Sequence, residues 1–381
     1  MKIEYALALI ALFLCGAASW TGWQTWPWQA AEPEPAPVTA VPPTPTTAPI
    51  ASPTPLPPTL ADFWHGRAEF VLDIADTGLP MGESETLIQP DGTLWSYVHA
   101  SDRSAGVVDQ CGDPVEFPGC MVIYRSEDAG QSFAPPNPAV CQIACTQCPC
   151  QPDIDHINQQ QYPRVQISDT GLHLLVYEYQ GRTVLRRSTD GLQWGNPEHV
   201  AYSGLWQKAS GCRPEEWIGV HPFTPFGADE CLAGGPPGIF IEGEMVYVFV
   251  GLGQNPGSMG CFHGRVTDHG DAFRPCANNP LFTGARTYGP ADLTGAESHP
   301  FWDFRMSSSA EIIKLDDQYY MLYEGIRGPG PNDPGDTQFG LGLARTTTGQ
   351  LDGHWEVYPL NPILVDLPGN IGLGHADLIL H

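Results

Sequence analysis

The sequence predicts an all-β protein whose repeated units form a β-propeller. Two recurring elements support this fold class: a polar turn that ends on an aromatic residue, and a tight turn followed by a strand rich in aromatic and β-branched residues. The composition agrees, with 42 Gly and 39 Pro among 381 residues. No long run of apolar residues at helical spacing occurs in the body of the chain, so helices have little room.

The first recurring element is a short β-like run followed by Arg, polar residues, an Asp or polar turn and a closing aromatic. The four copies are 124–133, 187–194, 265–273 and 345–355, closed by Phe133, Trp194, Phe273 and Trp355. These aromatics are 61, 79 and 82 residues apart, a spacing that suits one propeller blade with long loops. We therefore expect Asp128, Asp190 and Asp268 to lie in equivalent outer hairpins.

The second recurring element lies upstream of each copy of the first. The pairs of turn and strand are 91–92 before 94–98, 170–171 before 174–177, 242–243 before 245–249 and 316–317 before 319–323. A turn of this kind followed by bulky half-buried residues is a strong hairpin signal. Each unit thus predicts four strands, and units that must stack to bury their faces form a propeller.

The predicted number of blades is five, over residues 61–381. Four units are complete, and a fifth begins where Ala376-Asp377-Leu378-Ile379 repeats Ala310-Glu311-Ile312-Ile313. The sequence stops soon afterwards. We therefore expect the last blade to be incomplete or to be closed by an N-terminal strand within 63–74.

The N-terminal region predicts export. Lys2 precedes an apolar run that ends in small residues at 16–18, so residues 1–28 read as a signal peptide or, given four Trp between positions 20 and 28, a membrane anchor. Cys15 as a lipoprotein cysteine is disfavoured, because Leu14 before it is not small. Residues 29–60 form a Pro/Thr/Ala-rich linker. The expected location is extracytoplasmic, either secreted or anchored at the cell surface.

Ten cysteines lie in the body of the chain: Cys111, Cys120, Cys141, Cys145, Cys148, Cys150, Cys212, Cys231, Cys261 and Cys276. An even number in an exported protein favours disulfides, up to five, of undetermined connectivity. The dense cluster at 141–150 also resembles a metal site, but its spacing matches no common zinc or haem pattern. Disulfides are the preferred interpretation, and no metal site is predicted.

The charge limits the partners. With 17 basic and 43 acidic residues the net charge is −26, which argues against nucleic acid and anionic membranes as ligands. No phosphate loop, HExxH pair or Gly-x-Ser-x-Gly elbow occurs, so no cofactor is expected. The expected partner of a monomeric chain is a neutral saccharide, with membrane tethering only through the N-terminus.

Segments 126–133 and 188–194 resemble the Asp-box (BNR) repeat of sialidases and related propellers. The combination of 188–194, 314–323 and 355–364 is similar to the five-bladed glycoside hydrolases of the arabinanase, xylosidase and invertase type. This resemblance covers most of residues 80–380. It implies a glycosidase with two carboxylates facing each other across the central channel, about 5 to 5.5 Å apart for retention or about 6.5 to 9.5 Å for inversion.

The innermost strands supply the candidate residues. The catalytic candidates are Glu83, Glu85, Asp303, Glu311 and Asp377; the substrate-binding candidates are Arg164, Glu230, Trp302, Arg305 and His375. Because Glu311 and Asp377 hold the same place in adjacent units, we expect them to lie side by side. For any single carboxylate the competing interpretation is a solvated strand end or a hydrogen-bond acceptor for the neighbouring blade.

The sequence departs from the arabinanase pattern at two places. The first blade opens with Glu83-Ser84-Glu85 where that family usually has Asp, and the position of its acid Glu falls on Ser308. One alternative is therefore a non-catalytic Asp-box propeller that binds carbohydrate or protein at the cell surface. A sialidase-like hydrolase is a further alternative, but it needs three Arg and a Tyr/Glu pair, which the sequence does not assemble.

Overall fold

The computed structural model describes residues 6–7, 58–69, 84–99, 120–135, 141–148, 159–200, 233–252, 257–283, 303, 306–315, 317–327, 338–365, 371–372 and 375–378. The chain divides into two compact units, one of residues 1–12 and 70–380 and one of residues 13–69 and 381. The first contains the strands. Among the described residues no helix has the length and apolar character needed to cross a membrane.

The smaller unit contains helix α1 (Leu60–Trp64), which begins at a capping box. The Thr59 hydroxyl accepts from the Asp62 backbone N–H, and the Asp62 carboxylate accepts from the Thr59 backbone N–H, so both orphan donors of the helix start are satisfied. Residues 63–64, at the start of the segment 63–74 in which a closing strand was expected, are therefore helical. Residues 70–74 lie outside the described part of the chain.

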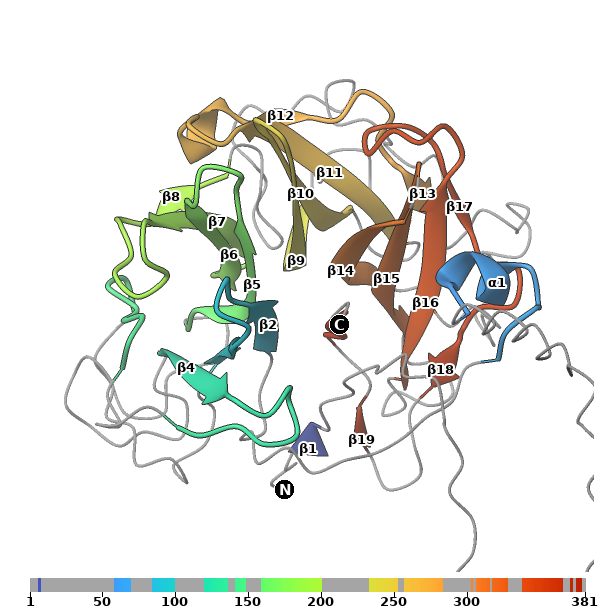
Figure 1. Cartoon of the computed structure of the whole chain (residues 1–381). Coiled ribbons are helices and arrows are strands. Elements are labelled where there is room, and N and C mark those ends of the chain that lie inside the picture. The colour runs from blue at the N-terminus through green and yellow to red at the C-terminus, as the bar shows by residue number, and fades with distance from the viewer. Residues whose placement is uncertain are drawn as a thin grey trace, which may run out of the picture. The chain divides into compact units, whose positions relative to one another are not determined.

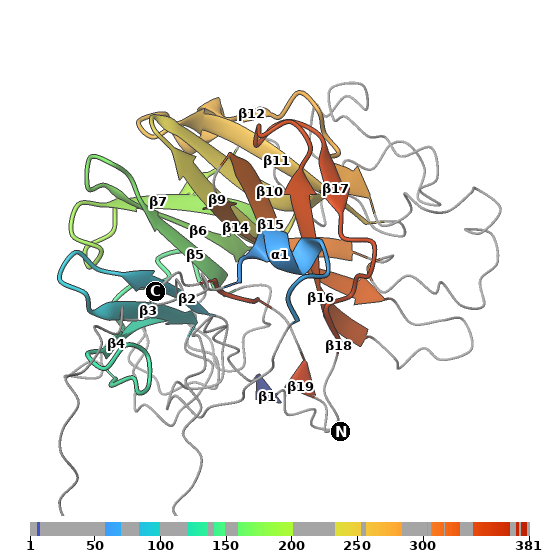
Figure 2. The same cartoon turned by 45° about the vertical axis from the view of Figure 1, so that its right-hand side comes forward.

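Four antiparallel sheets make up the larger unit, with one short parallel pair beside them (Figures 1 and 2). The first sheet contains β2 (Ser84–Ile88), β3 (Leu94–His99) and β4 (Met121–Ser126), and the second contains β5 (Gln161–Ile167), β6 (His173–Tyr179), β7 (Arg182–Ser188) and β8 (Glu198–His199). The third contains β9 (Ala233–Glu242), β10 (Met245–Leu252), β11 (Ser258–Arg265), β12 (Arg274–Pro275) and β13 (Phe282–Thr283). The fourth contains β14 (Met306–Leu315), β15 (Gln318–Arg327), β16 (Gln338–Thr346), β17 (Trp355–Val357) and β18 (Leu364–Val365), and the parallel pair is β1 (Ala6–Leu7) with β19 (Ile371–Gly372). 

The sheets are arranged as blades around a common centre. The first strands pack in series, β2 against β5, β5 against β9 and β9 against β14. Within each sheet the strands follow the order of the sequence, except that β13 pairs with β11 and β18 pairs with β16. This arrangement confirms the predicted all-β propeller. A meander of antiparallel strands with its first strand innermost is the blade that hairpin-connected repeats form.

The predicted number of five blades is not met: the described residues form four. Among the described residues the first blade has three strands, with two isolated bridges, Arg125 to Ala134 and Met121 to Ile143, where a fourth strand would follow. The segment 375–378 lies between the fourth and first blades, since Asp377 accepts a 2.7 Å bond from the Thr86 N–H and Ala376 packs against Leu322. It supplies one inner segment to the ring.

The outer Asp turns occupy equivalent places, as predicted. Each follows the third strand of its blade: Asp128 after β4, Asp190 after β7 and Asp268 after β11. The Asp128 carboxylate accepts from the Ser126 hydroxyl at 2.8 Å, and the Asp190 carboxylate accepts from the Ser188 hydroxyl at 2.9 Å. Asp268 instead accepts from the backbone N–H of Arg265, at 2.9 Å. Short polar side chains that bond nearby backbone and hydroxyl groups stabilise such turns.

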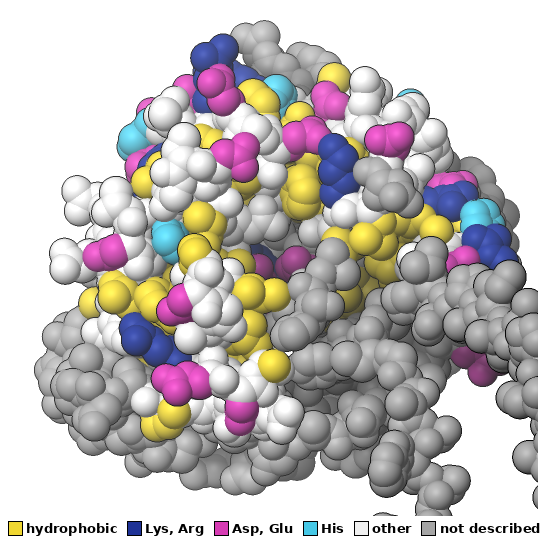
Figure 3. All heavy atoms as spheres, viewed as in Figure 1, with side chains coloured by type: hydrophobic (Ala, Val, Ile, Leu, Met, Phe, Trp, Pro, Cys, Tyr) yellow, Lys and Arg dark blue, Asp and Glu magenta, His cyan; other side chains and the backbone are white. Residues whose placement is uncertain are grey.

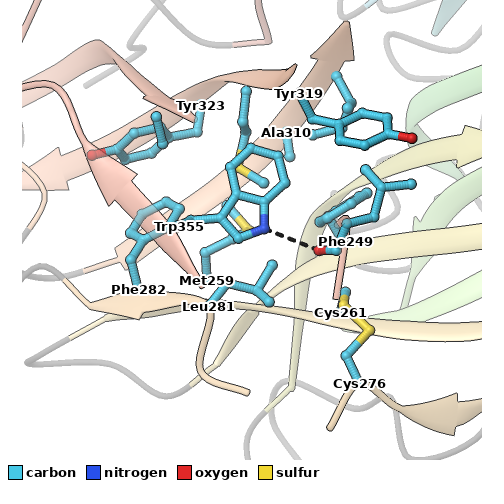
Figure 4. Close-up of a cluster of buried hydrophobic side chains, with 14 residues drawn as sticks. Phe249, Met259, Cys261, Cys276, Leu281, Phe282, Ala310, Tyr319, Tyr323 and Trp355 are labelled. Carbon is cyan, nitrogen blue, oxygen red and sulfur yellow. Dashed lines mark hydrogen bonds between the residues drawn. A yellow bond between two sulfur atoms is a disulfide. The ribbon is translucent and has the colours of Figure 1, made fainter. Parts of the chain in front are cut away.

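The core between the third and fourth blades is apolar (Figure 4). Trp355 is 1% exposed, and its indole N–H donates to the Leu351 carbonyl at 3.0 Å, so the buried polar atom of the ring is satisfied. Phe249 meets the Trp355 ring edge-on, with centroids 6.2 Å apart. This cluster joins β10 and β11 to the strands of the next blade.

Three disulfides lie in the described residues: Cys120–Cys141, Cys145–Cys148 and Cys261–Cys276. The preference for disulfides over a metal is thus confirmed at three of the four cysteines in the dense cluster. Cys111, Cys150, Cys212 and Cys231 lie outside the described residues.

Candidate functional site

The site is built on irregularities in the innermost segments of the propeller. A bulge interrupts β5 between Gln161 and Arg164, and another interrupts β14 between Ser308 and Glu311. Non-glycine residues with positive φ are uncommon. Three of the innermost segments nevertheless contain one, and in each the residue two positions later is charged. The pairs are Tyr162 (φ 56°) before Arg164, Ser309 (φ 51°) before Glu311 and His375 (φ 58°) before Asp377. Bulges re-aim the side chains that follow them.

The innermost strand of the third blade, β9, also has a register shift, but the shift ends at a glycine, which has no side chain. The register of β9 shifts between Gly234 and Gly238, and Gly235 has a φ of 82°. A Cβ on Gly238 would lie 2.2 Å from the Ala310 carbonyl oxygen. Only glycine fits there, because β9 and β14 are in backbone contact. The charged groups of the centre therefore come from the first, second and fourth blades and from segment 375–378.

Arg164 lies at the middle of these groups and is 2% exposed. Its Nη1 is 2.8 Å from Glu85 Oε2 and 3.8 Å from Glu311 Oε2, while Nη2 donates to the Ser309 hydroxyl at 2.8 Å and the Ala376 carbonyl at 3.0 Å. In Figure 3 charged side chains of both signs are visible at the bottom of the hollow at the centre of the blades. The Arg164 guanidinium, which belongs to the second blade, thus contacts the first blade, the fourth blade and segment 375–378.

Three carboxylates surround this guanidinium. Glu85, Glu311 and Asp377 each have one carboxylate oxygen within 4.8 Å of the others', which confirms the expectation that Glu311 and Asp377 lie side by side. Burial raises the pKa of Glu85 to about 8, with a further increase from Asp377 and an opposing effect of Arg164. Burial also raises the pKa of Asp377 to about 6 against the opposing effect of Arg164, and raises that of Glu311 well above its usual value.

The charge balance explains these directions. Burial lowers the pKa of Arg164, but Glu85, Glu311 and Asp377 outweigh it and raise the pKa, so the guanidinium remains charged. One cation cannot neutralise three carboxylates in a site shielded from water, so the group retains protons at neutral pH. Carboxylate oxygens are also the ligands that hard divalent cations prefer. Here the Arg164 guanidinium already supplies a positive charge to two of the three carboxylates, Glu85 and Glu311.

A second polar array adjoins Arg164. The Ser309 Oγ lies 2.7 Å from His375 Nδ1, and His375 Nε2 lies 3.7 Å from Glu324 Oε2. The Ser308 hydroxyl donates to Glu324 Oε1 at 3.4 Å, and the His375 ring packs on Tyr162 with centroids 4.3 Å apart. Glu324 is 2% exposed. Sequence reasoning missed it, although a carboxylate directly after the apolar run 319–323 was the available signal.

Of the remaining candidates, only Asp303 lies in the part of the chain that the structure describes. Asp303 is buried, and its carboxylate accepts from the Tyr323 hydroxyl at 3.1 Å; burial raises its pKa to about 6 despite that bond. The structure therefore holds Asp303 at β15 and does not group it with the three central carboxylates; its catalytic role stays a prediction. Glu83, Glu230, Trp302 and Arg305 lie outside the described residues. The residues brought together are Glu85, Arg164, Glu311, His375 and Asp377.

Comparison with known proteins finds distant likenesses. No protein-family model matches the chain, and no curated protein sequence matches it. An endo-1,4-β-xylanase from Bacteroides thetaiotaomicron aligns with 78% of this chain and 80% of its own at 13% identity and a TM-score of 0.43. An endo-arabinase from the same organism aligns with 75% of this chain and 82% of its own, at 11% identity and a TM-score of 0.41. A glycosyl hydrolase from Bacteroides ovatus aligns with 73% of this chain and 70% of its own, at 13% identity and a TM-score of 0.44. The propeller assignment rests on the chain's own sheets.

Proposed function

We propose that this chain is an exported, glycoside hydrolase-like propeller that cleaves glycosidic bonds in neutral saccharides with the carboxylates of its centre. The observation that carries the proposal is the convergence of Glu85, Glu311 and Asp377, with one oxygen each within 4.8 Å of the others'. Two carboxyl groups separated by about 5 to 5.5 Å are the arrangement of retaining glycosidases. Retention of configuration is therefore the expected stereochemical outcome.

The pKa values divide the roles between these groups. Glycoside cleavage needs one protonated carboxyl as general acid and one ionised carboxylate as nucleophile or base. Glu85, with a pKa of about 8, is protonated at neutral pH and is the acid. Asp377, with a pKa of about 6 and a 2.7 Å bond from the Thr86 N–H, is the ionised partner. Burial raises the pKa of Glu311 well above its usual value, which favours its protonated form near both.

A second function follows from the same contacts. Arg164 is nearly fully buried, and its bonds to Glu85, Ser309 and the Ala376 carbonyl join separate parts of the ring. Because these hydrogen bonds pair the Arg164 guanidinium, the network also supports a non-catalytic propeller that binds carbohydrate or protein. In such a propeller the buried charges would hold the blades together. The sialidase-like alternative gains no support, because it needs three Arg and, of the two Arg among the candidates, the described residues place only Arg164 at the centre.

Turnover decides between hydrolysis and binding. Wild-type protein is assayed on aryl glycosides and neutral oligosaccharides beside Glu85→Gln and Asp377→Asn, with the exposed Glu244→Gln as matched control. General acid–base catalysis contributes about 10²- to 10⁴-fold, so each central variant should lose activity on that scale while Glu244→Gln keeps it. Thermal melts establish that each variant is folded. Saccharide binding without turnover by the folded wild type would reject the hydrolase and leave the binding module.

The proposal of export has support from the three disulfides, because such bonds persist in oxidising compartments. In it, residues 1–28 direct or anchor the chain and residues 29–60 space a monomeric propeller from the surface. Cell fractionation combined with N-terminal sequencing tests this order: recovery of the full-length reduced chain in the cytoplasm would contradict it.

A further inference from the structure

Ser309, His375 and Glu324 form a line of three side chains that come from β14, segment 375–378 and β15. The serine hydroxyl is within hydrogen-bond distance of the imidazole, at 2.7 Å, and the far nitrogen of the imidazole is 3.7 Å from the glutamate carboxylate. A hydroxyl beside a base that is itself oriented by a third group is the arrangement that activates a serine nucleophile. It is recognised by geometry on unrelated folds, whatever the order of the residues along the chain.

The hydrogen bonds around Ser309 fix the direction of its proton. Arg164 Nη2 donates to the Ser309 Oγ at 2.8 Å, so the hydroxyl accepts on that side and its own proton is available for His375 Nδ1. In the tautomer that carries its proton on Nε2, the imidazole accepts at Nδ1 and directs Nε2–H toward Glu324. Every group in the line then has a donor facing an acceptor.

The backbone at Ser309 is also unusual. Its φ of 51° lies in the left-handed region, within the bulge of β14 that faces Glu324 and Leu322 across the ladder. Strained non-glycine residues of this kind concentrate at functional sites, where the surrounding structure holds them. The adjacent His375 has a φ of 58°.

We propose that Ser309 is the nucleophile of an acyl-transfer site, with His375 as general base and acid and Glu324 as the positioning residue. The substrate class is a carboxylic ester with a small acyl group of acetyl size, because Ser309 is only 2% exposed. This activity is separate from glycosidic cleavage and does not depend on it.

The chemistry balances as ester hydrolysis. The Ser309 hydroxyl gives its proton to His375 Nδ1 as its oxygen bonds to the ester carbonyl carbon, and the alcohol leaves with that proton as the C–O bond breaks. Water then loses a proton to His375 and attacks the acyl-serine, which releases the carboxylic acid and restores the hydroxyl. The Arg164 cation beside the Ser309 oxygen favours the negative charge that develops at the reacting centre.

The rival interpretation is a structural network that only supports closure of the ring. The two interpretations predict different reactivity of Ser309, because an ordinary buried serine does not react with a fluorophosphate. Folded wild-type protein is incubated with a small dialkyl fluorophosphate, and labelling is followed by intact mass and peptide mapping. We expect one label, on the peptide that contains Ser309.

Two variants give the matched comparison. Ser309→Ala should abolish the label, whereas Ser307→Ala, at a fully buried serine of the same strand, should keep it. His375→Gln should slow labelling by about 10²- to 10⁴-fold, the usual contribution of a general base. A folded wild type that takes no label, or a label on another residue, overturns the proposal, and this outcome is independent of whether Ser309→Ala folds.

The role of Glu324 has its own readout. In Glu324→Gln a neutral amide no longer favours the protonated imidazole, so the labelling rate should rise at lower pH than in wild type and reach a lower plateau. A merely structural role would leave the pH profile unmoved and change only the folded fraction. Release of acetate from 4-nitrophenyl acetate, faster for wild type and Ser307→Ala than for Ser309→Ala, completes the test. Equal rates in all three would contradict it.

Discussion

Two junctions of the propeller ring are built from opposite chemistry. Between the third and fourth blades the contact is glycine and apolar side chains: a Cβ on Gly238 would meet the Ala310 carbonyl oxygen at 2.2 Å, and one on Gly257 would meet the Met306 Cα at 2.4 Å. Around Arg164 the first and fourth blades and segment 375–378 meet the second through buried charges. Both junctions use a bulge in the innermost strand.

The difference shows how one repeat can serve packing at one place and chemistry at another. In β9 a glycine at the end of the bulge lets the backbones of two blades touch. This backbone contact involves no charge that would need water or an opposite charge beside it. A charged residue at the equivalent place must be desolvated and paired, and such pairs give little net stability compared with apolar packing. The ring retains charges where they converge on the centre, so that junction is the one expected to respond to pH.

The largest effect is expected from Arg164→Met. This variant leaves three buried carboxylates without their counter-charge, and breaking a buried ion pair costs about 3 to 5 kcal/mol. The loss in free energy of unfolding should be greatest at pH 8 and smaller at pH 5, where the carboxylates can hold protons. Urea unfolding at both pH values measures it. The exposed Arg265→Met serves as control, and an equal loss at both pH values would contradict the charged character of the junction.

Gly238→Ala tests the apolar junction. The new methyl group would overlap the Ala310 carbonyl, and overpacking of this kind costs about 1 to 3 kcal/mol. Because no ionisable group is involved, the loss should be the same at pH 5 and pH 8. Gly195→Ala is the control, since its Cβ would lie 3.4 Å from the nearest atom. A pH-dependent loss in Gly238→Ala would show that the two junctions are not independent.

The pH dependence of the wild type sharpens the comparison further. The pKa of Glu85 is raised from its usual 4.5 to about 8, so between these values the folded state binds more protons than the unfolded state. Stability should therefore be present at low pH and fall as pH rises through that window, by up to about 1.4 kcal/mol per pH unit. Glu85→Gln should flatten the slope. Glu244→Gln should not, and identical slopes in the two variants would reject the raised pKa.

Much of the fold could be read from the sequence because its signals are local. An Asp or Gly turn and the alternating strand after it fix a hairpin within about ten residues, and the Asp128 and Asp190 turns recur at the same place in each unit. The number of blades could not be read in this way. It depends on how segments far apart in the sequence meet at the centre, and segment 375–378 contributes one inner segment where an incomplete fifth blade was expected.

The site was predictable in part for the same reason. The likeness of Ala-Glu-Ile-Ile and Ala-Asp-Leu-Ile placed Glu311 beside Asp377, and the structure agrees. The position of Arg164 among three carboxylates depends on bulges and on contacts between residues 79 to 212 positions apart. The position of Glu324 behind His375 depends on a contact between residues 51 positions apart. No local pattern encodes those contacts. Asp303 was grouped with the others from its strand-end position alone, and its hydrogen-bond partner in the structure is Tyr323.

The smallest effect is expected at the outer link between the second and third blades. There Arg187 pairs with Glu198 at 2.6 Å, and Glu198 accepts from the Gly270 N–H at 2.8 Å. Both side chains are 17% exposed, and ion pairs near the surface contribute about 0.2 to 1 kcal/mol. Glu198→Gln should therefore lower the free energy of unfolding by no more than this, and 1 M NaCl should remove most of the difference because salt screens such pairs. Urea midpoints at low and high salt measure it. A loss as large as that of Arg164→Met, unchanged by salt, would mean that charges secure the ring at its rim as strongly as at its centre.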